Sequence, residues 1–440
     1  MRVIHIPRRF TLNAWGGTET YILEIARRLK SHDIQAEIFC PSALDSPGEE
    51  EIRGVLVRRF PYFYPHLGLS KEQTAQMDRK GGNLFSLALL QALRNEPDID
   101  LIHLHTGKRL GGIGRHIAQS RNIPYYITVH EGAVCVPGKG HPVASQGSPE
   151  WGRALGCWGG NQNILHDAAA VIFVDREEAE KARVLQQKEG SDLPQSDRIR
   201  YLPGGVDVQR FANGNGRRFR HKYNITDHEP VVATIARIEP EKNQLDAVRA
   251  FDLARGALQE GVLLLAGPIT NQGYYDHVQR EIQQRGLSDS VLIVTDLDPL
   301  GQELVDAYHA ADCLLLPSIH EPLGLAILEA WAAGCPVITS DASGPVSFTR
   351  HAEDVFHFPV SDVYSATEYI IRILSNSDLA DSLADAGNYR ARTEFSWDVI
   401  TARMAQWYRE TLGVKPVSAS AAGQIPTHVS ETDENVTIHG

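Results

Sequence analysis

Short runs of β-branched and other apolar residues alternate with amphipathic helical patterns from the second residue of the chain onward. Strands that are apolar on both faces need helices on both sides, so this alternation is typical of parallel sheets in α/β proteins. The first series predicts a helix over 18–30 and strands over 2–6, 36–39, 101–104, 126–129 and 170–174. We expect these segments to form one doubly wound layer.

A second series of the same kind begins near residue 231. It predicts helices such as 243–258 and 274–285 between strands over 231–235, 263–266, 291–294, 313–316 and 337–339. The charge also changes along the chain, since residues 1–200 are close to neutral and the rest carries the excess of acidic groups. We therefore expect an α/β protein with two Rossmann-like doubly wound domains that face each other across a cleft.

The join between the two domains is expected near 205–225, where Asn213-Gly214-Asn215-Gly216 interrupts any regular element. An amphipathic helix is predicted over 397–412, with Ile400, Met404, Trp407 and Leu412 on its apolar side. Small polar residues follow Gly413 and are typical of a disordered tail. The predicted division is 1–210 for the N-terminal domain, 211–396 for the C-terminal domain, 397–413 for a helix that packs back toward the first domain and 414–440 for the tail.

Composition excludes several classes of protein. The net charge of −12 argues against a general nucleic-acid binder. No stretch approaches the roughly 18 apolar residues that span a bilayer, and the chain begins directly with a strand pattern rather than a signal peptide. Five cysteines are odd in number and scattered without paired spacing, which favours a reducing compartment. We expect a cytoplasmic protein.

The most informative stretch is His320-Glu321-Pro322-Leu323-Gly324-Leu325, which follows the strand predicted over 313–316. A helix that begins near Gly324 directs free backbone N–H groups and the positive end of its dipole toward the cleft, which suits a phosphate. Glu321 lies just before this helix, and Glu329 points back toward the same end because helical side chains tilt N-terminally.

Carboxylates beside a phosphate are wrong for the phosphate itself but right for the hydroxyl groups of an attached sugar or ribose. For an isolated pair of glutamates, the simpler alternative is an ordinary helix N-terminus with an acidic first turn. The sequence around Arg237 and Lys242 reverses that preference. These two cations follow the first strand of the second series, at the carboxyl end of a parallel sheet, where they suit a diphosphate. Their alternative is a surface pair with Glu239 and Glu241.

At this point the chain resembles the family-4 retaining glycosyltransferases of GT-B fold. The resemblance covers nearly the whole chain, and the ordered set of motifs is more specific than any single one. The set comprises Gly16-Gly17-Thr18-Glu19, His130, Pro203-Gly204-Gly205-Val206-Asp207 with Phe211, Arg237 with Lys242, and Glu321 with Glu329 followed by Gly334-Cys335-Pro336-Val337-Ile338.

The resemblance implies a role for each donor-side residue. Arg237 and Lys242 are expected to hold the donor diphosphate and to neutralise the charge that grows on it as the sugar leaves. Glu329 is expected to bind the ribose hydroxyls and Glu321 the donor sugar. The backbone N–H groups of Gly324 and Leu325 assist at the sugar or the phosphate.

The resemblance also implies contributions from the first domain. His130, at the end of the strand predicted over 126–129, is expected near the donor sugar and the attacking acceptor. Gly16 and Gly17 bring the first loop close to the diphosphate. Asp296 and Leu297 occupy the place where such enzymes hold the base. The first domain then binds the acceptor and the second binds the nucleotide-sugar donor.

The expected reaction moves a hexose-type sugar from a nucleotide diphosphate sugar to a glycan or lipid-linked acceptor, with retention of configuration. No cofactor or metal is expected, because the two cations Arg237 and Lys242 can replace a divalent ion. Two departures from the family pattern stand out: Gly204 replaces an asparagine, which leaves the turn intact, and Ser347 replaces a glutamate, which affects the donor-sugar contacts.

Weaker features keep two interpretations each. His103 and His105 are expected to face one side of a strand. They are either metal ligands or polar residues at a strand end near the cleft, and the second interpretation is preferred. Cys135, His141 and Cys157 lack a fourth ligand for zinc. The long segment 131–160 is either an acceptor-contacting loop or irregular packing. Basic residues of the first domain either contact a membrane at its inner, cytoplasmic face or form a solvated face, and the solvated face is preferred. They are Arg27, Arg28, Lys30, Arg58, Arg59, Lys108, Arg109 and Arg115.

Competing functions also stay open. A sugar-nucleotide epimerase or a glycoside phosphorylase can use the same scaffold, and a non-catalytic nucleotide-sugar-binding protein can descend from it. Epimerisation needs no acceptor, and a phosphorylase needs free phosphate and no nucleotide. The presence of all four charged groups, Arg237, Lys242, Glu321 and Glu329, speaks against the non-catalytic alternative.

Overall fold

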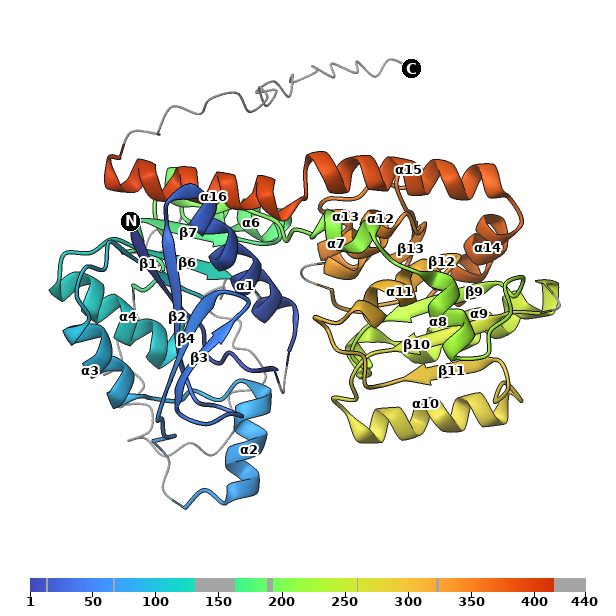
Figure 1. The fold of residues 1–440 in the computed structure, drawn as a ribbon, viewed down its shortest axis with the longest axis horizontal. Helices are drawn as coiled ribbons and strands as arrows, with labels where there is room; N and C mark the ends of the chain where they lie inside the picture. Colours follow the sequence, from blue (N-terminus) through green and yellow to red (C-terminus); the bar gives the residue numbers. More distant parts are fainter. Residues whose placement is uncertain are drawn as a thin grey trace, which may run out of the picture.

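The computed structural model describes residues 1–12, 15–65, 68–130, 163–187, 193–258, 260–321 and 324–414. Two α/β halves lie side by side, each built around its own sheet, and two long helices near the C-terminus run along one edge of both (Figure 1). The two-domain α/β fold class predicted from the alternating pattern is confirmed.

The first sheet has eight strands in the order β3-β4-β2-β1-β5-β6-β7-β8. All neighbouring pairs are parallel except β3 with β4, which forms an antiparallel hairpin at the edge. The strands are β1 Arg2–Ile6, β2 Gln35–Pro41, β3 Gly48–Ile52, β4 Val55–Phe60, β5 Leu101–Leu104, β6 Tyr125–Val129, β7 Ala170–Phe173 and β8 Ile199–Tyr201.

Register in this sheet sets the position of several polar side chains. β1 pairs with β5 so that His5 lies opposite His103, and β5 pairs with β6 so that His103 lies opposite Tyr126. Because side chains alternate along a strand, residues two apart share a face. His5, His103 and the residues that follow at the strand ends are thereby brought to one face of the sheet.

Helices cover both faces of the first sheet (Figure 1). The helix α1 carries a buried stripe of Ile22, Leu23, Ile25, Ala26 and Leu29, the apolar side expected from the sequence. The helices of this half are α1 Gly17–Leu29, α2 Lys71–Lys80, α3 Leu87–Asn95, α4 Lys108–Ser120 and α6 Arg176–Leu185, with 3₁₀ turns at Lys30–His32 and Ser196–Arg198.

The second sheet has six strands, all parallel, in the order β11-β10-β9-β12-β13-β14. They are β9 Val231–Ile235, β10 Val262–Ala266, β11 Val291–Val294, β12 Cys313–Leu316, β13 Val337–Ser340 and β14 Phe356–Phe358. The reversal of strand order lies between β9 and β12, and ligands of open α/β sheets bind outside the carboxyl ends at such a point.

The helices of the second half fill both faces of its sheet. A 3₁₀ turn at Pro240–Lys242 follows β9. The helices are α7 Val208–Ala212, α8 Gly216–Lys222, α9 Gln244–Leu258, α10 Gln272–Gln284, α11 Gln302–Ala310, α12 Leu325–Ala333, α13 Ser343–Val346 and α14 Val363–Leu374, followed by α15 Ser377–Thr393. The break between α7 and α8 lies at 213–215, where the Asn-Gly repeat was expected to interrupt regular structure.

The last helix, α16 Trp397–Leu412, returns to the first half (Figure 1). Its buried Trp397, Ile400, Met404 and Tyr408 pack in one cluster with residues of β1, α1 and β6. The chain therefore passes between the halves twice, and the two passages are hydrogen-bonded: Val206 N donates to Phe395 O at 2.8 Å, and Trp397 N donates to Val206 O at 3.0 Å.

No helix within the described ranges has both the length and the apolar composition that a membrane crossing requires. The tail predicted over 414–440 lies outside the described residues apart from Val414. The division of the chain at residues 210, 396 and 413 stays a proposal.

Candidate functional site

Lys242 and Glu321 form a nearly buried ion pair between two neighbouring loops of the second half. The Lys242 ammonium donates to Oε2 of Glu321 at 2.8 Å, and the two side chains are 10% and 12% exposed. The loops meet because β9 and β12 are adjacent and parallel, and the backbone N of Ile319 donates to Glu241 O at 2.8 Å. The sequence placed both residues at this edge, and the structure brings them into direct contact.

Glu321 also reaches the start of α12. Its Oε1 accepts from the backbone N of Gly324 at 3.3 Å. Gly324 has a φ of +60°, in the left-handed region, and a Cβ there would lie 2.7 Å from the ring of Phe348. Only glycine meets both constraints without strain. No described side chain caps the helix, and Ile327 N donates to Gly324 O at 3.0 Å. The N–H groups of Leu325 and Ala326 are therefore available to an anion.

Arg237 lies on the side of the second half that faces the first. Its guanidinium contacts Glu239 at 2.8 Å and is 39% exposed, so the pairing with Glu239 considered as an alternative does occur. Lys242, in contrast, pairs with Glu321 and not with Glu241. The positive charge of Arg237 also acts on Glu19 of α1, where it lowers the pKa against the larger raising effect of burial.

Glu329 occupies the middle of α12 and contacts a tyrosine. The Tyr308 hydroxyl donates to Oε2 of Glu329 at 2.7 Å. Burial raises the pKa of Glu329 to about 7, against the lowering effects of the Tyr308 hydrogen bond and Arg210. Glu24 of α1 adds to the rise. Burial, and then the charges of Glu329 and Glu321, raise the pKa of Tyr308.

The first loop of the first half ends at the N-terminus of α1. Gly16 is the N-cap residue, Gly17 is the first helical residue, and no side chain in the described part of the chain caps the helix. A Cβ on Gly16 would lie 3.3 Å from Oε2 of Glu19, and Glu19 in turn contacts Arg9 at 3.3 Å. The two glycines therefore lie beside Glu19, the residue on which the charge of Arg237 acts.

His130 follows β6 and is buried, with 7% of its surface exposed. Its Nε2 lies 2.9 Å from Nδ1 of His105, and its ring meets Tyr21 edge to face. Burial lowers the pKa of His130 to about 3, so the imidazole is neutral at ordinary pH. The contacts of His130 lie within the first half rather than with Arg237 or Lys242.

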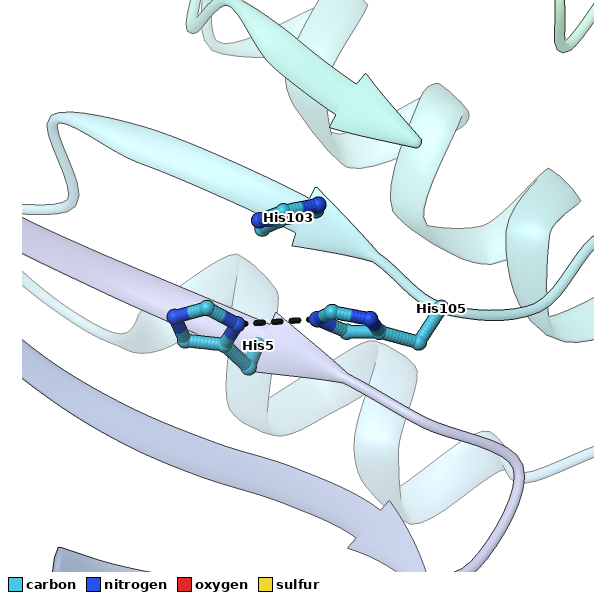
Figure 2. A group of neighbouring side chains, drawn as sticks. All are labelled: His5, His103 and His105. Carbon is cyan, nitrogen blue, oxygen red and sulfur yellow. Dashed lines mark hydrogen bonds between the residues drawn. The ribbon is translucent and has the colours of Figure 1, made fainter. Parts of the chain in front are cut away.

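His5, His103 and His105 form the buried cluster shown in Figure 2. Their ring nitrogens lie within 4.8 Å of one another, a spacing compatible with a metal. His103 is occupied by the Tyr408 hydroxyl and by Thr128 Oγ1, the latter at 2.7 Å. The rings are also stacked or tilted by 19–34°, whereas a metal about 2.0 Å from each nitrogen must lie close to all three ring planes. The cluster therefore fits hydrogen bonding better than metal binding.

Sequence reasoning did not identify His5 as a partner of His103 and His105. The missing signal was the β1–β5 register, which pairs His5 with His103.

Asp296 and Leu297 follow β11, the edge strand of the second sheet. Asp296 is exposed, and Leu297 packs on the same core cluster as the start of α12.

Arg8 and Lys108 are a second feature that the motifs did not reveal. They follow the adjacent strands β1 and β5, and neither makes an ion pair with any described carboxylate. Burial lowers the pKa of Lys108, and the charge of Arg8 lowers it further. The Lys108 ammonium donates to the backbone O of Gly81 at 3.3 Å, at the same end of α2 as the Asp78 carbonyl that Arg8 contacts. Arg8 donates to the backbone O of Asp78, and its Nη1 is buried without a partner among the described residues.

The basic residues considered for a membrane surface are mostly neutralised within the chain. Five of them pair with carboxylates: Arg27 and Arg28 with Glu24 and Asp207, Arg58 with Glu49 and Glu96, Arg59 with Asp45 and Glu50, and Arg115 with Asp167. The segment 131–160, with Cys135, His141 and Cys157, lies outside the described residues.

Comparison with known families divides the chain much as its two sheets do. Residues 16–205 match the family described as "Glycosyl transferase 4-like domain", and residues 216–390 match "Glycosyl transferases group 1". Together these matches span most of the 440 residues.

Similar curated proteins include two D-inositol 3-phosphate glycosyltransferases. That of Corynebacterium glutamicum is 26% identical over 409 residues, covering 90% of this chain and 92% of that protein. That of Mycolicibacterium smegmatis is 29% identical over 404 residues, covering 90% and 86%.

Solved structures show the same fold at lower identity. Sucrose-phosphate synthase from Thermosynechococcus elongatus has a TM-score of 0.70 at 22% identity and covers 94% of this chain and 100% of that one. The Anabaena protein HepE, in complex with UDP and glucose, has a TM-score of 0.67 at 17% identity and covers 92% and 98%.

Proposed function

The chain is a family-4 glycosyltransferase of the GT-B fold, and from this premise we propose that it is a retaining enzyme that uses a nucleotide diphosphate sugar. The proposed reaction moves a hexose-type sugar to a hydroxyl group of the acceptor. The proposed location is cytoplasmic, in keeping with the scattered cysteines.

The observation that carries the proposal is the arrangement of charges outside β9 and β12. Lys242 is held by Glu321 at 2.8 Å, next to the uncapped start of α12. Arg237 projects toward the first half, where its charge reaches Glu19. Two cations and a set of free N–H groups at the switch point of a parallel sheet suit a diphosphate.

The chemistry follows from what must be stabilised. The bond between the sugar C1 and the diphosphate oxygen breaks, and its electron pair stays on that oxygen. The acceptor oxygen forms the new bond to C1 on the same face, and its proton passes to the departing diphosphate. We assign Arg237 and Lys242 to the negative charge that develops on the leaving group, because preorganised cations are most effective where charge grows.

The two glutamates are assigned to hydroxyl groups. Glu321 is a hydrogen-bond acceptor fixed in place by Lys242 and Gly324, and we assign it to the donor sugar. Glu329 is held by Tyr308 and keeps partial exposure, and we assign it to the ribose. Gly16, Gly17 and His130 complete the site from the first half, and Asp296 and Leu297 border the base. No cofactor or metal is part of the proposal.

Two classes of acceptor deserve separate consideration. A glycan or lipid-linked saccharide is the acceptor expected from the resemblance, and contact with a membrane stays a prediction attached to it. Arg8 and Lys108 favour a second class, a phosphorylated polyol or sugar, because two neighbouring cations that form no ion pair with a described carboxylate suit an anion. This second class is also consistent with the inositol 3-phosphate named for the curated relatives.

The proposal is tested first by ligand binding. Uridine, guanosine and adenosine diphosphates are screened by thermal unfolding, since a ligand at 100 times its Kd stabilises the folded state by about 2.7 kcal/mol. We expect one of the three to raise the unfolding temperature. The matching nucleotide sugar is then incubated with and without acceptor, and the products are analysed by NMR for anomeric configuration.

The outcomes separate the alternatives. Transfer that requires both donor and acceptor supports the proposal, and an inverted product would remove the retaining assignment. A change of the donor sugar without acceptor would identify an epimerase. Turnover with free phosphate and no nucleotide would identify a phosphorylase. Nucleotide binding without turnover of any sugar would identify a binding protein.

A further inference from the structure

Three buried imidazoles form a continuous hydrogen-bonded chain across the carboxyl ends of β1, β5 and β6. Nδ1 of His5 lies 2.9 Å from Nε2 of His105, and Nδ1 of His105 lies 2.9 Å from Nε2 of His130. Figure 2 shows the first of these bonds. The three residues are 0%, 8% and 7% exposed. This row of hydrogen-bonded imidazoles thus runs from the interior of the first half to His130, which the proposed function places at the donor sugar.

A neutral imidazole carries one N–H and one lone pair, so the protons of this chain can be counted. Each of the two hydrogen bonds holds one proton, and His105 supplies only one of them. If His105 donates to His130, then His5 donates to His105 and the N–H of His130 must be on Nδ1. If the direction is reversed, Nδ1 of His130 carries the lone pair and Nε2 of His5 carries the N–H. The two free ends therefore always have opposite character.

All three rings are neutral. Burial lowers the pKa of His5 and of His130 to about 3, and burial together with the neighbouring imidazoles lowers the pKa of His105 well below its ordinary value. No described carboxylate forms an ion pair with any of them. Their surroundings are Tyr21 and the stacked ring of His103.

The buried end of the chain decides its direction. Nε2 of His5 is buried and has no partner among the described residues. Either direction leaves one N–H without a described partner, and an orphaned N–H is rare in protein interiors. His5 is 0% exposed and His130 is 7% exposed, so the N–H belongs at the His130 end, which is nearer to solvent and ligand. The lone pair therefore belongs on Nε2 of His5, which leaves the N–H on Nδ1 of His130. That nitrogen is also buried without a described partner, so an oxygen supplied by a bound sugar would satisfy it.

We propose that His5 and His105 are positioning residues that fix the tautomer of His130 as an N–H donor at Nδ1. In this role His130 donates a hydrogen bond to a sugar oxygen and does not act as a general base. The inference rests on the proposed function for the identity of the ligand, but the tautomer itself is a property of the unliganded protein.

The tautomer is measured directly by NMR on protein labelled with ¹⁵N-histidine. We expect Nδ1 of His130 to be protonated and Nε2 to be unprotonated, with no change between pH 6 and pH 8. Assignment uses the missing signals of His130→Gln. A protonated Nε2 of His130, or a charged ring in this range, would overturn the inference whether or not the protein transfers sugar.

Substitution of His105 tests the coupling through activity. An asparagine side chain can present its amide N–H near the place of Nδ1, whereas phenylalanine presents no donor. We expect His105→Phe to lower kcat/KM about 10-fold, with the Nδ1 proton of His130 no longer fixed, and His105→Asn to restore most of the loss. Equal losses in both variants, with the His130 tautomer unchanged, would show that His105 only fills space.

His103→Asn is the matched control. His103 is also buried and its ring stacks on His105. Its nitrogens, however, bond to Tyr408 and Thr128 and not to any of the three histidines that are hydrogen-bonded to one another. We expect lower thermal stability and an unchanged His130 tautomer. Loss of the tautomer in this variant would mean that general packing, rather than the hydrogen-bonded chain, sets it. If the NMR result holds but no sugar is transferred, the proposed function fails and the tautomer assignment stands.

Discussion

The carboxyl edges of the two sheets have the same topology but carry different kinds of side chain. In the second half this edge carries ionic groups, namely the nearly buried Lys242, whose side chain is 10% exposed, and Arg237, whose side chain is 39% exposed. In the first half it carries neutral imidazoles that are buried, with His5 and His103 at 0%. One edge is suited to charge that appears on a leaving group, and the other to uncharged sugar oxygens.

The difference follows from solvation. A buried charge requires a partner and a buried neutral ring requires only hydrogen bonds, because removing an ion from water is far more costly. Lys242 therefore has Glu321 at 2.8 Å, whereas the histidine chain contains no carboxylate. A doubly wound sheet provides the place for a ligand, and the residues after its strands decide which kind of ligand it takes.

Removal of the charge of Lys242 is the most direct test of the proposed role of the ionic edge in the second half. We expect Lys242→Ala to lower kcat by about 10²–10³, since a preorganised group at the developing charge is lost. Initial rates with the identified donor and acceptor measure this. Lys222→Ala is the control, because Lys222 pairs with Glu303 on the exposed surface of the same half. Unchanged turnover by Lys242→Ala would refute the leaving-group role.

Arg8 and Lys108 provide a second test of the comparison, because they are charged residues at the otherwise neutral carboxyl edge of the first sheet. We expect Arg8→Ala to raise KM for a phosphorylated acceptor about 10-fold and to leave the donor KM unchanged, since a charge-assisted hydrogen bond is lost. Paired acceptors with and without the phosphate give the measurement, and Lys71→Ala, on the exposed start of α2, is the control. An equal effect on both acceptors would exclude a phosphate contact.

Glu329 tests whether ligand binding at the carboxyl edge of the second sheet depends on pH. With a pKa of about 7, its ionised fraction rises from roughly 10% at pH 6 to roughly 90% at pH 8. Ribose hydroxyls donate to the carboxylate, so nucleoside diphosphate affinity should rise up to about 10-fold over this range. Isothermal titration at several pH values measures it. In Glu329→Gln the dependence should disappear, and a persistent slope would assign it to another group.

The same group has a smaller effect on stability. Its folded pKa is raised above the ordinary value of 4.5, so the folded state binds the proton more tightly and loses stability as pH rises from 4.5 to 7. We expect Glu329→Gln to increase the unfolding free energy at pH 8 by about 1–3 kcal/mol, below the full shift because the residue is partly exposed. Urea unfolding at pH 4 should show little difference between the two proteins.

Sequence patterns were most informative where strands are continuous apolar runs. The strand Val231–Ile235 and the helix Trp397–Leu412 have the predicted bounds, and the loops of Lys242 and Glu321 were correctly expected at one sheet edge. The hairpin of β3 and β4 was missed, since β3 is rich in exposed glutamates and has no apolar period. It is also an antiparallel edge in a sheet expected to be parallel.

The histidine chain could not be found from spacing. His5 and His105 are separated by 100 residues, and their contact depends on the order β1-β5-β6 and on the register within it. Arg8 and Lys108 depend on the same strand order. In contrast, Gly324 was singled out from its place before a helix, and its φ of +60° gives the physical reason.

The passage of the chain through Val206 and back through Trp397 has a consequence for synthesis. The first half lacks one wall of its core until the last helix has left the ribosome, because Ile400, Met404 and Tyr408 complete the cluster around Val3 and Tyr21. The N-terminal segment is thus made first but matures last, after the intervening half has already had time to fold. A chain that ends before residue 397 would therefore leave the apolar residues that α16 covers exposed to water.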